Sequence, residues 1–129
     1  MRKVTRTMLE KCATLEGAEI LAGLTEEQID EAYNGIGADW MPECLRDRIS
    51  KIWHIFEPAA VVHDCQCRYE QDRSIDNFHF RNRQYLNNCI KLVRDEYPWW
   101  HYKRYVFLRS ADLMYDILED YGWLAWKAR

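Results

Sequence analysis

Apolar residues recur at helical spacing along most of the chain, and no stretch has the strict alternation of a half-buried strand. Three helical segments are expected before the first glycine-rich turn, at residues 5–15, 18–24 and 25–32. The third begins at Thr25, and the side chains of Thr25 and Gln28 have the spacing of a capping box. The pattern therefore predicts an all-α fold.

The rest of the chain predicts four more helices, at residues 42–56, 59–69, 74–97 and 100–119. Pro42 suits the first turn of its helix. We expect Glu57 and Pro58 to interrupt the chain between two helices, because proline disfavours a helical residue before it. Ser74 can cap the longest helix, and Gly122 is expected to end the last one.

The chain of 129 residues has the length of one domain and contains no internal repeat. Its net charge is −3, with acidic and basic residues interspersed, so no nucleic-acid partner is expected. The first ten residues lack the apolar stretch of a signal peptide, and no apolar run reaches the ~18 residues of a membrane span. We therefore expect a cytoplasmic protein with no transmembrane segment.

An odd number of irregularly spaced cysteines predicts reduced thiols rather than a disulfide framework. The five are Cys12, Cys44, Cys65, Cys67 and Cys89. His63 and Cys67 lie four residues apart and share a helix face, so a transition-metal site is an open alternative. It would need further ligands, such as Cys89 or His79, and buried thiols are the preferred interpretation.

Two short motifs carry candidate chemistry. In Tyr33-Asn34-Gly35-Ile36-Gly37, two glycines allow a tight turn that aims backbone carbonyls inward, as calcium prefers. In His63-Asp64, neighbouring helix positions point about 100° apart, so the two side chains serve adjacent subsites. Histidine suits a general base, and aspartate suits a cation ligand.

Together these motifs resemble the phospholipase A2 superfamily, in which Tyr-x-Gly-x-Gly precedes His-Asp; here His63 lies 26 positions after Gly37. The chain is most similar to the short, disulfide-free branch found in phage and prophage genomes and in parvovirus capsid proteins. Residues 81–89 resemble its Ala-Asp-x-x-Phe-x-x-Asn-Met helix, and residues 111–126 resemble its tail of alanine, aromatic and glycine residues. The resemblance covers about residues 29–126.

The resemblance implies two long antiparallel helices that carry the active site, with further helices at the N-terminal and C-terminal ends. It implies that calcium is held by the carbonyls of Tyr33, Gly35 and Gly37 and by the carboxylate of Asp64. It also implies that His63 takes a proton from the water that attacks an ester, while calcium stabilises the oxyanion.

The chain departs from the family pattern at two positions. Asn82 stands where the family has a second aspartate, so it can orient His63 but cannot stabilise imidazolium by charge. Asp76 lies nearly two turns away on the same helix and is a poor substitute. Cys67 stands where the tyrosine of His-Asp-x-x-Tyr is expected, and Tyr69 matches that tyrosine only after a two-residue insertion.

Two functions follow as expectations. The first is a calcium-dependent phospholipase A2-type hydrolase, phage- or prophage-encoded, that acts on phospholipid or a membrane surface. The second is a catalytically silent phage protein of the same fold that binds a virion or host protein. Its location would be the cytoplasm of an infected or lysogenic bacterium, or the virion.

Aromatic residues near basic ones at the C-terminal end suit a lipid or a protein interface, but core packing is the preferred interpretation. They are Trp99, Trp100, Tyr102, Tyr105, Trp123 and Trp126. The basic residues of the long helix are expected to form a solvated face. They are Arg81, Arg83, Lys91 and Arg94.

Overall fold

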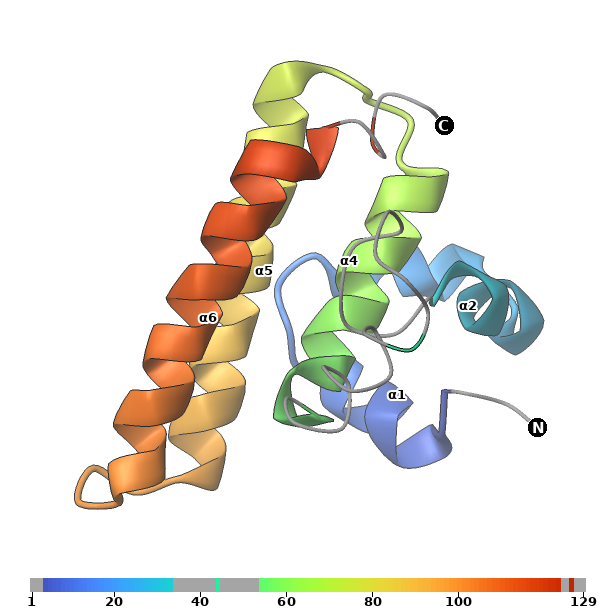
Figure 1. Cartoon of the computed structure of the whole chain (residues 1–129). Coiled ribbons are helices and arrows are strands. Elements are labelled where there is room, and N and C mark those ends of the chain that lie inside the picture. The colour runs from blue at the N-terminus through green and yellow to red at the C-terminus, as the bar shows by residue number, and fades with distance from the viewer. Residues whose placement is uncertain (1–3, 34–43, 45–53, 124–125, 127–129) are drawn as a thin grey trace.

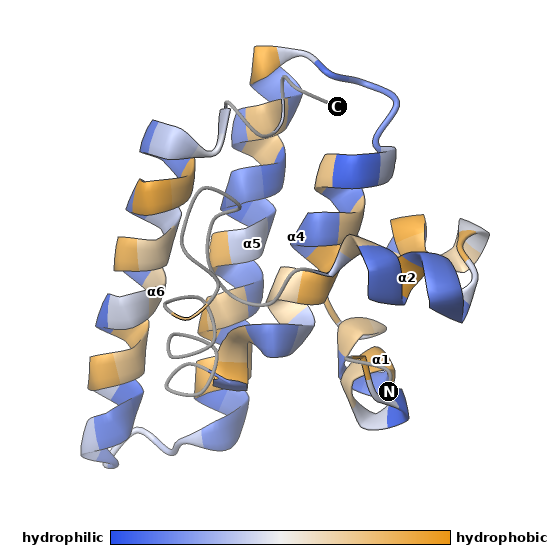
Figure 2. Cartoon of the chain, turned by 45° about the vertical axis from the view of Figure 1, so that its right-hand side comes forward, coloured by the Kyte–Doolittle hydropathy of each residue, from blue (hydrophilic) through white to orange (hydrophobic). Residues whose placement is uncertain are grey.

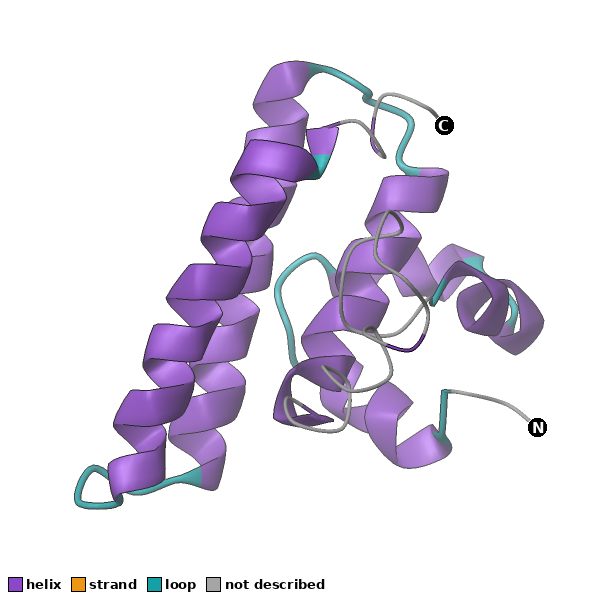
Figure 3. Ribbon diagram, viewed as in Figure 1, coloured by secondary structure: helices purple, strands orange, loops and turns teal. Residues whose placement is uncertain are grey.

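The computed structural model describes residues 4–33, 44, 54–123 and 126, and all regular structure in these ranges is helical (Figures 1 and 3). The all-α prediction is therefore confirmed. In chain order the elements are α1 (Arg6–Cys12), the 3₁₀ helix η1 (Ala18–Gly23), α2 (Glu26–Ala32), the 3₁₀ helix η2 (His54–Phe56), α4 (Glu57–Tyr69), α5 (Ile75–Glu96) and α6 (Tyr102–Tyr121). The helix predicted at residues 42–56 lies mostly outside the described ranges.

Hydroxyl side chains begin three of these helices. Thr5 accepts a hydrogen bond from the Met8 amide, and Ser74 accepts one from the amide of Asn77. Thr25 and Gln28 bond reciprocally, which is the predicted capping box. Each cap satisfies an amide that the first helical turn leaves without a partner, so local sequence sets where these helices start.

The interruption expected at Glu57 and Pro58 is absent, and that prediction was wrong. Helix α4 starts at Glu57 and continues directly from η2, with Pro58 in its first turn. A proline is tolerated there because amides of the first turn have no helical acceptor to lose. Gly122 ends α6 as predicted, but with right-handed backbone angles.

Helix α4 lies in the middle of the molecule, with α1 and α2 on one side and the α5–α6 hairpin on the other (Figure 1). The helices α5 and α6 run antiparallel, and Figure 2 shows polar and apolar residues interleaved along both. The apolar turn at residues 59–62 of α4 is buried in the hydrophobic core. Residues 59–62, directly before His63, therefore lie at the centre of the core. The helices α4 and α5 are antiparallel, but α4 has 13 residues and is shorter than α5 and α6, with 22 and 20.

Buried amides fasten the loop between α1 and η1 to the long helices. Asn88 of α5 bonds both backbone groups of Glu16, accepting from its amide at 2.8 Å and donating to its carbonyl at 3.0 Å. Gln66 of α4 donates to the Gly17 carbonyl and to the side chain of Gln84. Because Gln66 and Asn88 are almost fully buried, these bonds remove most of the cost of burying two polar groups.

Trp126, near the C-terminal end of the sequence, packs over the loop between α4 and α5. Its indole donates to the Arg73 carbonyl at 3.2 Å, and the Arg73 guanidinium lies 4.2 Å above its ring and donates to its carbonyl. Trp123 and Trp126 also pack against Phe78, so core packing describes them. It does not describe Trp99, whose side chain is 73% exposed.

The exposed aromatic residues gather where α5 turns into α6. They are Trp99, Trp100, Tyr102 and Tyr105. Arg83, Lys91 and Arg94 are exposed as expected, whereas Arg81 is partly buried and pairs with Glu70 at 2.8 Å. No helix among the described residues is both long enough and apolar enough to cross a membrane.

Gly17 is a position where only glycine fits. Its φ is 79°, and a Cβ built there would lie 2.2 Å from Gln66 Nε2 and 2.6 Å from Gln84 Oε1. We expect Gly17→Ala to lower the free energy of unfolding by at least about 1–2 kcal/mol from the left-handed backbone alone. Urea unfolding measures this. Gly23→Ala is the matched control, because nothing lies within 4 Å of its Cβ position. Equal effects of the two substitutions would contradict the prediction.

Candidate functional site

His63 and Asn82 meet between two antiparallel helices. His63 Nε2 lies 2.8 Å from Asn82 Oδ1, with His63 on α4 and Asn82 on α5. The Asn82 side chain is fully buried, and His63 is only 6% exposed. Two of the predicted site residues, His63 and Asn82, are thus in direct contact.

The other end of the Asn82 amide bonds a carboxylate from α6. Asn82 Nδ2 donates to Glu119 Oε2 at 3.4 Å, and the Tyr115 hydroxyl donates to Glu119 Oε1 at 2.6 Å. His79 of α5 also contacts Glu119 Oε2. Burial alone would raise the pKa of Glu119, but hydrogen bonds from Tyr115, His79 and Asn82 together lower it. Glu119 is therefore an ionised acceptor near neutral pH.

The ionised carboxylate decides which way the Asn82 amide points. A carboxylate can only accept hydrogen bonds, so the Asn82 NH₂ group faces Glu119 and its carbonyl oxygen faces His63. That oxygen can only accept, so His63 Nε2 must carry the ring proton. His63 Nδ1 is then left with a lone pair, which makes it the basic nitrogen of the ring.

Cys67 occupies the position next to that basic nitrogen. Its Sγ lies 3.6 Å from His63 Nδ1. The two residues are four apart on α4, and side chains of a helix lean toward its N-terminus, so Cys67 reaches back over His63. With Nδ1 as the acceptor, the Cys67 thiol is the donor. The spacing predicted that these two residues share a helix face, but it did not predict a hydrogen bond between them.

The surroundings of His63 favour a neutral ring. Burial lowers the pKa of His63, although the charge of Asp64 and the hydrogen bond to Asn82 oppose this effect. The ring of Tyr85, also on α5, lies 5.1 Å from the His63 ring. Tyr85 and Asn82, both on α5, contact the His63 imidazole. These contacts fix the orientation of the ring.

Part of the predicted calcium set lies in the described structure. Tyr33, at the end of α2, is buried, and its pKa is raised by burial and by the nearby charges of Glu57 and Asp64. The Tyr33 side chain therefore lies near two carboxylates of α4. Of the other predicted residues, Gly35 and Gly37 lie outside the described residues, as do Asn34 and Ile36.

Tyr69 is half-buried at the C-terminal end of α4 and packs against the core. It lies six residues beyond His63, which turns it to a different face of the helix. Asp76 is exposed in the first turn of α5. The structure thus supports neither residue as a direct partner of His63.

The transition-metal alternative would require cysteine and histidine side chains to converge. Cys65 is fully buried and Cys67 is partly exposed, because the two point to different faces of α4. Within the described ranges, no group of three or more His, Cys, Asp and Glu side chains is arranged to hold a metal. All five cysteines are described, and none forms a disulfide.

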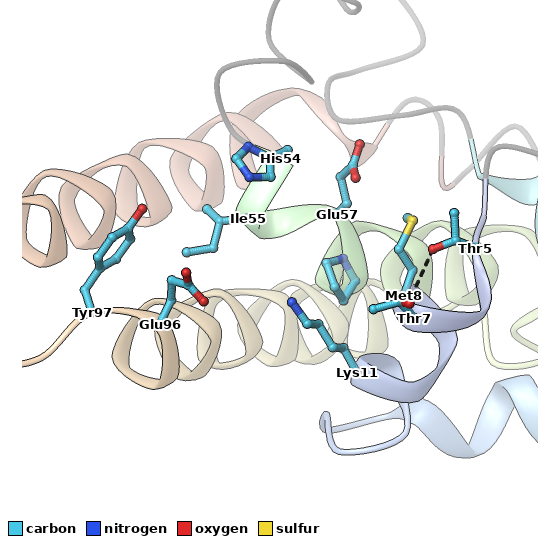
Figure 4. Close-up of a pocket in the computed structure, with 10 residues that line it drawn as sticks. Thr5, Thr7, Met8, Lys11, His54, Ile55, Glu57, Glu96 and Tyr97 are labelled. Carbon is cyan, nitrogen blue, oxygen red and sulfur yellow. Dashed lines mark hydrogen bonds between the residues drawn. The ribbon is translucent and has the colours of Figure 1, made fainter.

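A separate pocket of about 240 Å³ lies at the start of α4, between α1 and the end of α5 (Figure 4). Its polar lining includes Lys11, His54, Glu57 and Glu96. Neither His63 nor Cys67 lines it, so this pocket is separate from the contacts of His63.

Comparisons with protein-family models, with curated proteins and with solved structures gave no match for this chain. The candidate site therefore depends on its own geometry. Of the residues around the imidazole, sequence reasoning singled out His63 and Asn82 but missed Tyr85, Tyr115 and Glu119. The Tyr115–Glu119 spacing of four residues was visible, but nothing in the sequence linked it to Asn82.

The Glu119 network predicts a particular sensitivity to acid. Its pKa is lowered in the folded state from an ordinary value of 4.5. The stabilisation is thus fully present above that value and is lost as the pH falls through the folded-state pKa. We expect Glu119→Gln to remove about 1 kcal/mol of unfolding free energy at pH 7 and less at pH 3. Urea unfolding across this range measures the difference.

The control is Asp112→Asn, an exposed carboxylate on the same helix, which should leave the acid dependence nearly unchanged. A loss in Glu119→Gln that is the same at pH 3 and pH 7 would contradict an ionised Glu119.

Proposed function

We propose that this chain is a calcium-dependent ester hydrolase of the phospholipase A2 type, encoded by a phage or prophage, with His63 as general base. The observation that carries the proposal is the 2.8 Å contact between His63 Nε2 and Asn82 Oδ1. It leaves Nδ1 as the proton acceptor, and burial keeps the ring neutral by lowering the His63 pKa. A neutral, oriented imidazole is what general-base catalysis requires.

In the proposed reaction, water replaces the Cys67 thiol at His63 Nδ1 and gives this nitrogen a proton as the water oxygen attacks the ester carbonyl. The same nitrogen then returns the proton to the departing alcohol. Asn82 holds the ring but is neutral, so the negative charge that stabilises imidazolium comes from Glu119, one hydrogen bond further away. This arrangement gives weaker stabilisation than a carboxylate in direct contact, since Coulomb attraction falls with distance.

Calcium would be held by the carbonyls of Tyr33, Gly35 and Gly37 and by the Asp64 carboxylate, and it would supply positive charge for the developing oxyanion. The described half of this set fits a hard cation. Burial raises the pKa of the Tyr33 phenol, and the charges of Glu57 and Asp64 raise it further, so the Tyr33 side chain lies near the carboxylate that would hold the cation. Carboxylate oxygens are ligands that calcium prefers.

Fatty-acid release from phospholipid vesicles tests the proposal. We expect release with calcium and little with a chelator. His63→Ala should reduce the rate at least about 100-fold, the usual contribution of a general base. Asp64→Asn should raise the calcium concentration needed for half-maximal rate, because it removes the charged ligand.

His54→Ala is the matched control, since His54 is exposed and lies outside the dyad. Calcium-independent release, or full activity in His63→Ala, would contradict the proposal.

Asn82→Asp tests the role of the missing charge, but the new carboxylate would lie beside Glu119 Oε2, 3.4 Å from the Asn82 Nδ2 position. Two carboxylates at that distance cannot both ionise readily. We therefore expect the double variant Asn82→Asp, Glu119→Gln to hydrolyse at least about 10-fold faster than the wild type, and faster than Asn82→Asp alone. Initial rates at saturating calcium measure this order, and a slower double variant would contradict it.

A second candidate is the catalytically silent phage protein that binds a virion or host protein. The observation that favours it is the exposed aromatic cluster between α5 and α6, which includes Trp99 and Trp100. Exposed aromatic side chains of this kind are enriched in protein interfaces. The cluster follows the C-terminal end of α5, which lies about 21 Å from Asn82 by helix rise. A folded wild type that releases no fatty acid at saturating calcium would favour this candidate.

A further inference from the structure

The basic nitrogen of His63 faces a sulfur atom. The 3.6 Å contact from Cys67 Sγ to His63 Nδ1 and the 2.8 Å contact from His63 Nε2 to Asn82 Oδ1 use the two ring nitrogens separately. A nucleophile bonded to a base, with the base held by a third group, is the arrangement of a nucleophilic triad. Thiol, imidazole and amide are a known combination of such groups.

We propose that Cys67, His63 and Asn82 form a thiol nucleophile site that reacts with acyl esters. This inference does not rest on calcium or on a lipid substrate. It assigns the attacking atom to Cys67 Sγ, whereas the hydrolase proposed above uses water.

The reaction needs only water besides the ester. The Cys67 S–H proton passes to His63 Nδ1, Sγ bonds to the ester carbonyl carbon, and the bond from that carbon to the alcohol oxygen breaks. The alcohol leaves with the proton from Nδ1, and Cys67 carries the acyl group. Water then attacks the thioester, gives a proton to Nδ1, and Sγ departs and recovers that proton.

Three features single out Cys67 among the cysteines. It is partly exposed, whereas Cys12, Cys65 and Cys89 are fully buried. Arg73 donates to the Cys67 carbonyl at 2.8 Å, which places a permanent positive charge close to this residue. The hydrogen-bonded histidine can accept the thiol proton, which is how a cysteine nucleophile is usually activated.

Glu119 acts in this site as a positioning residue. It holds the Asn82 amide through Nδ2, and that bond turns Oδ1 toward His63. Without it, the Asn82 amide could present its NH₂ group to the ring and place the lone pair on Nε2 instead. Nδ1 would then carry the proton and could not accept one from Cys67.

Alkylation of the intact wild-type chain by iodoacetamide tests the thiol. Tandem mass spectrometry gives the rate at each cysteine, with exposed Cys44 as the internal reference and buried Cys65 as the unreactive one. We expect Cys67 to react at least severalfold faster than Cys44, although it is less exposed. His63→Asn should slow Cys67 at least tenfold, Glu119→Gln should slow it by a smaller factor, and His54→Ala should not change it.

Acyl transfer is tested with 4-nitrophenyl acetate in the presence of a calcium chelator. The acetyl group should appear on Cys67 in the wild type, and it should be absent from this position in His63→Asn. Thermal unfolding verifies that each variant is folded. Should His63→Asn fail to fold, the rate at Cys67 in Glu119→Gln decides, since Glu119 does not touch the thiol.

The inference is overturned if Cys67 reacts more slowly than Cys44, if its rate is the same in the folded variants as in the wild type, or if no acetyl group reaches it. These results are separable from those for the calcium-dependent hydrolase. Lipid hydrolysis that persists in Cys67→Ala would leave water as the nucleophile there. Acetylation of Cys67 in a chain that releases no fatty acid would support the thiol site alone.

Discussion

A buried amide has to find a partner for each of its ends, and the Asn82 side chain does so by bonding a different helix at each end. Its oxygen contacts His63 on α4, and its nitrogen contacts Glu119 on α6. An unsatisfied polar group in this position would cost about 1–3 kcal/mol. The positions of α4 and α6 relative to α5 therefore depend on the Asn82 side chain. The same bonds determine which nitrogen of the imidazole is basic.

Local sequence accounts for much of the fold. Thr5, Thr25 and Ser74 mark helix starts because their hydroxyls satisfy amides of the first turn, and this chemistry needs no distant partner. The failure at Glu57 and Pro58 has the same origin, since a proline that ends one helix can equally begin another. Only the packing of η2 against the core distinguishes these outcomes, and packing is not visible in a local pattern.

The site was predictable to the extent that it follows helix geometry or a motif. His63 and Cys67 share a face because they are four residues apart, and Asn82 was indicated by the resemblance. Glu119 was not, because which residue of α6 lies opposite Asn82 depends on the turn between α5 and α6 and on the packing of the hairpin. Tyr69 was assigned by motif matching alone, and a shift of two helical positions was enough to turn it away.

The paired amide and carboxylate at positions 82 and 119 have a consequence for how this chain can evolve. Asparagine and aspartate differ little in volume, as do glutamine and glutamate, so the negative charge could move from one helix to the other without repacking. The order of the two steps matters, because one intermediate buries two like charges and the other buries two neutral amides. Mutational paths that change position 119 first are therefore the accessible ones. We expect position 119 to have changed before position 82 wherever both have changed.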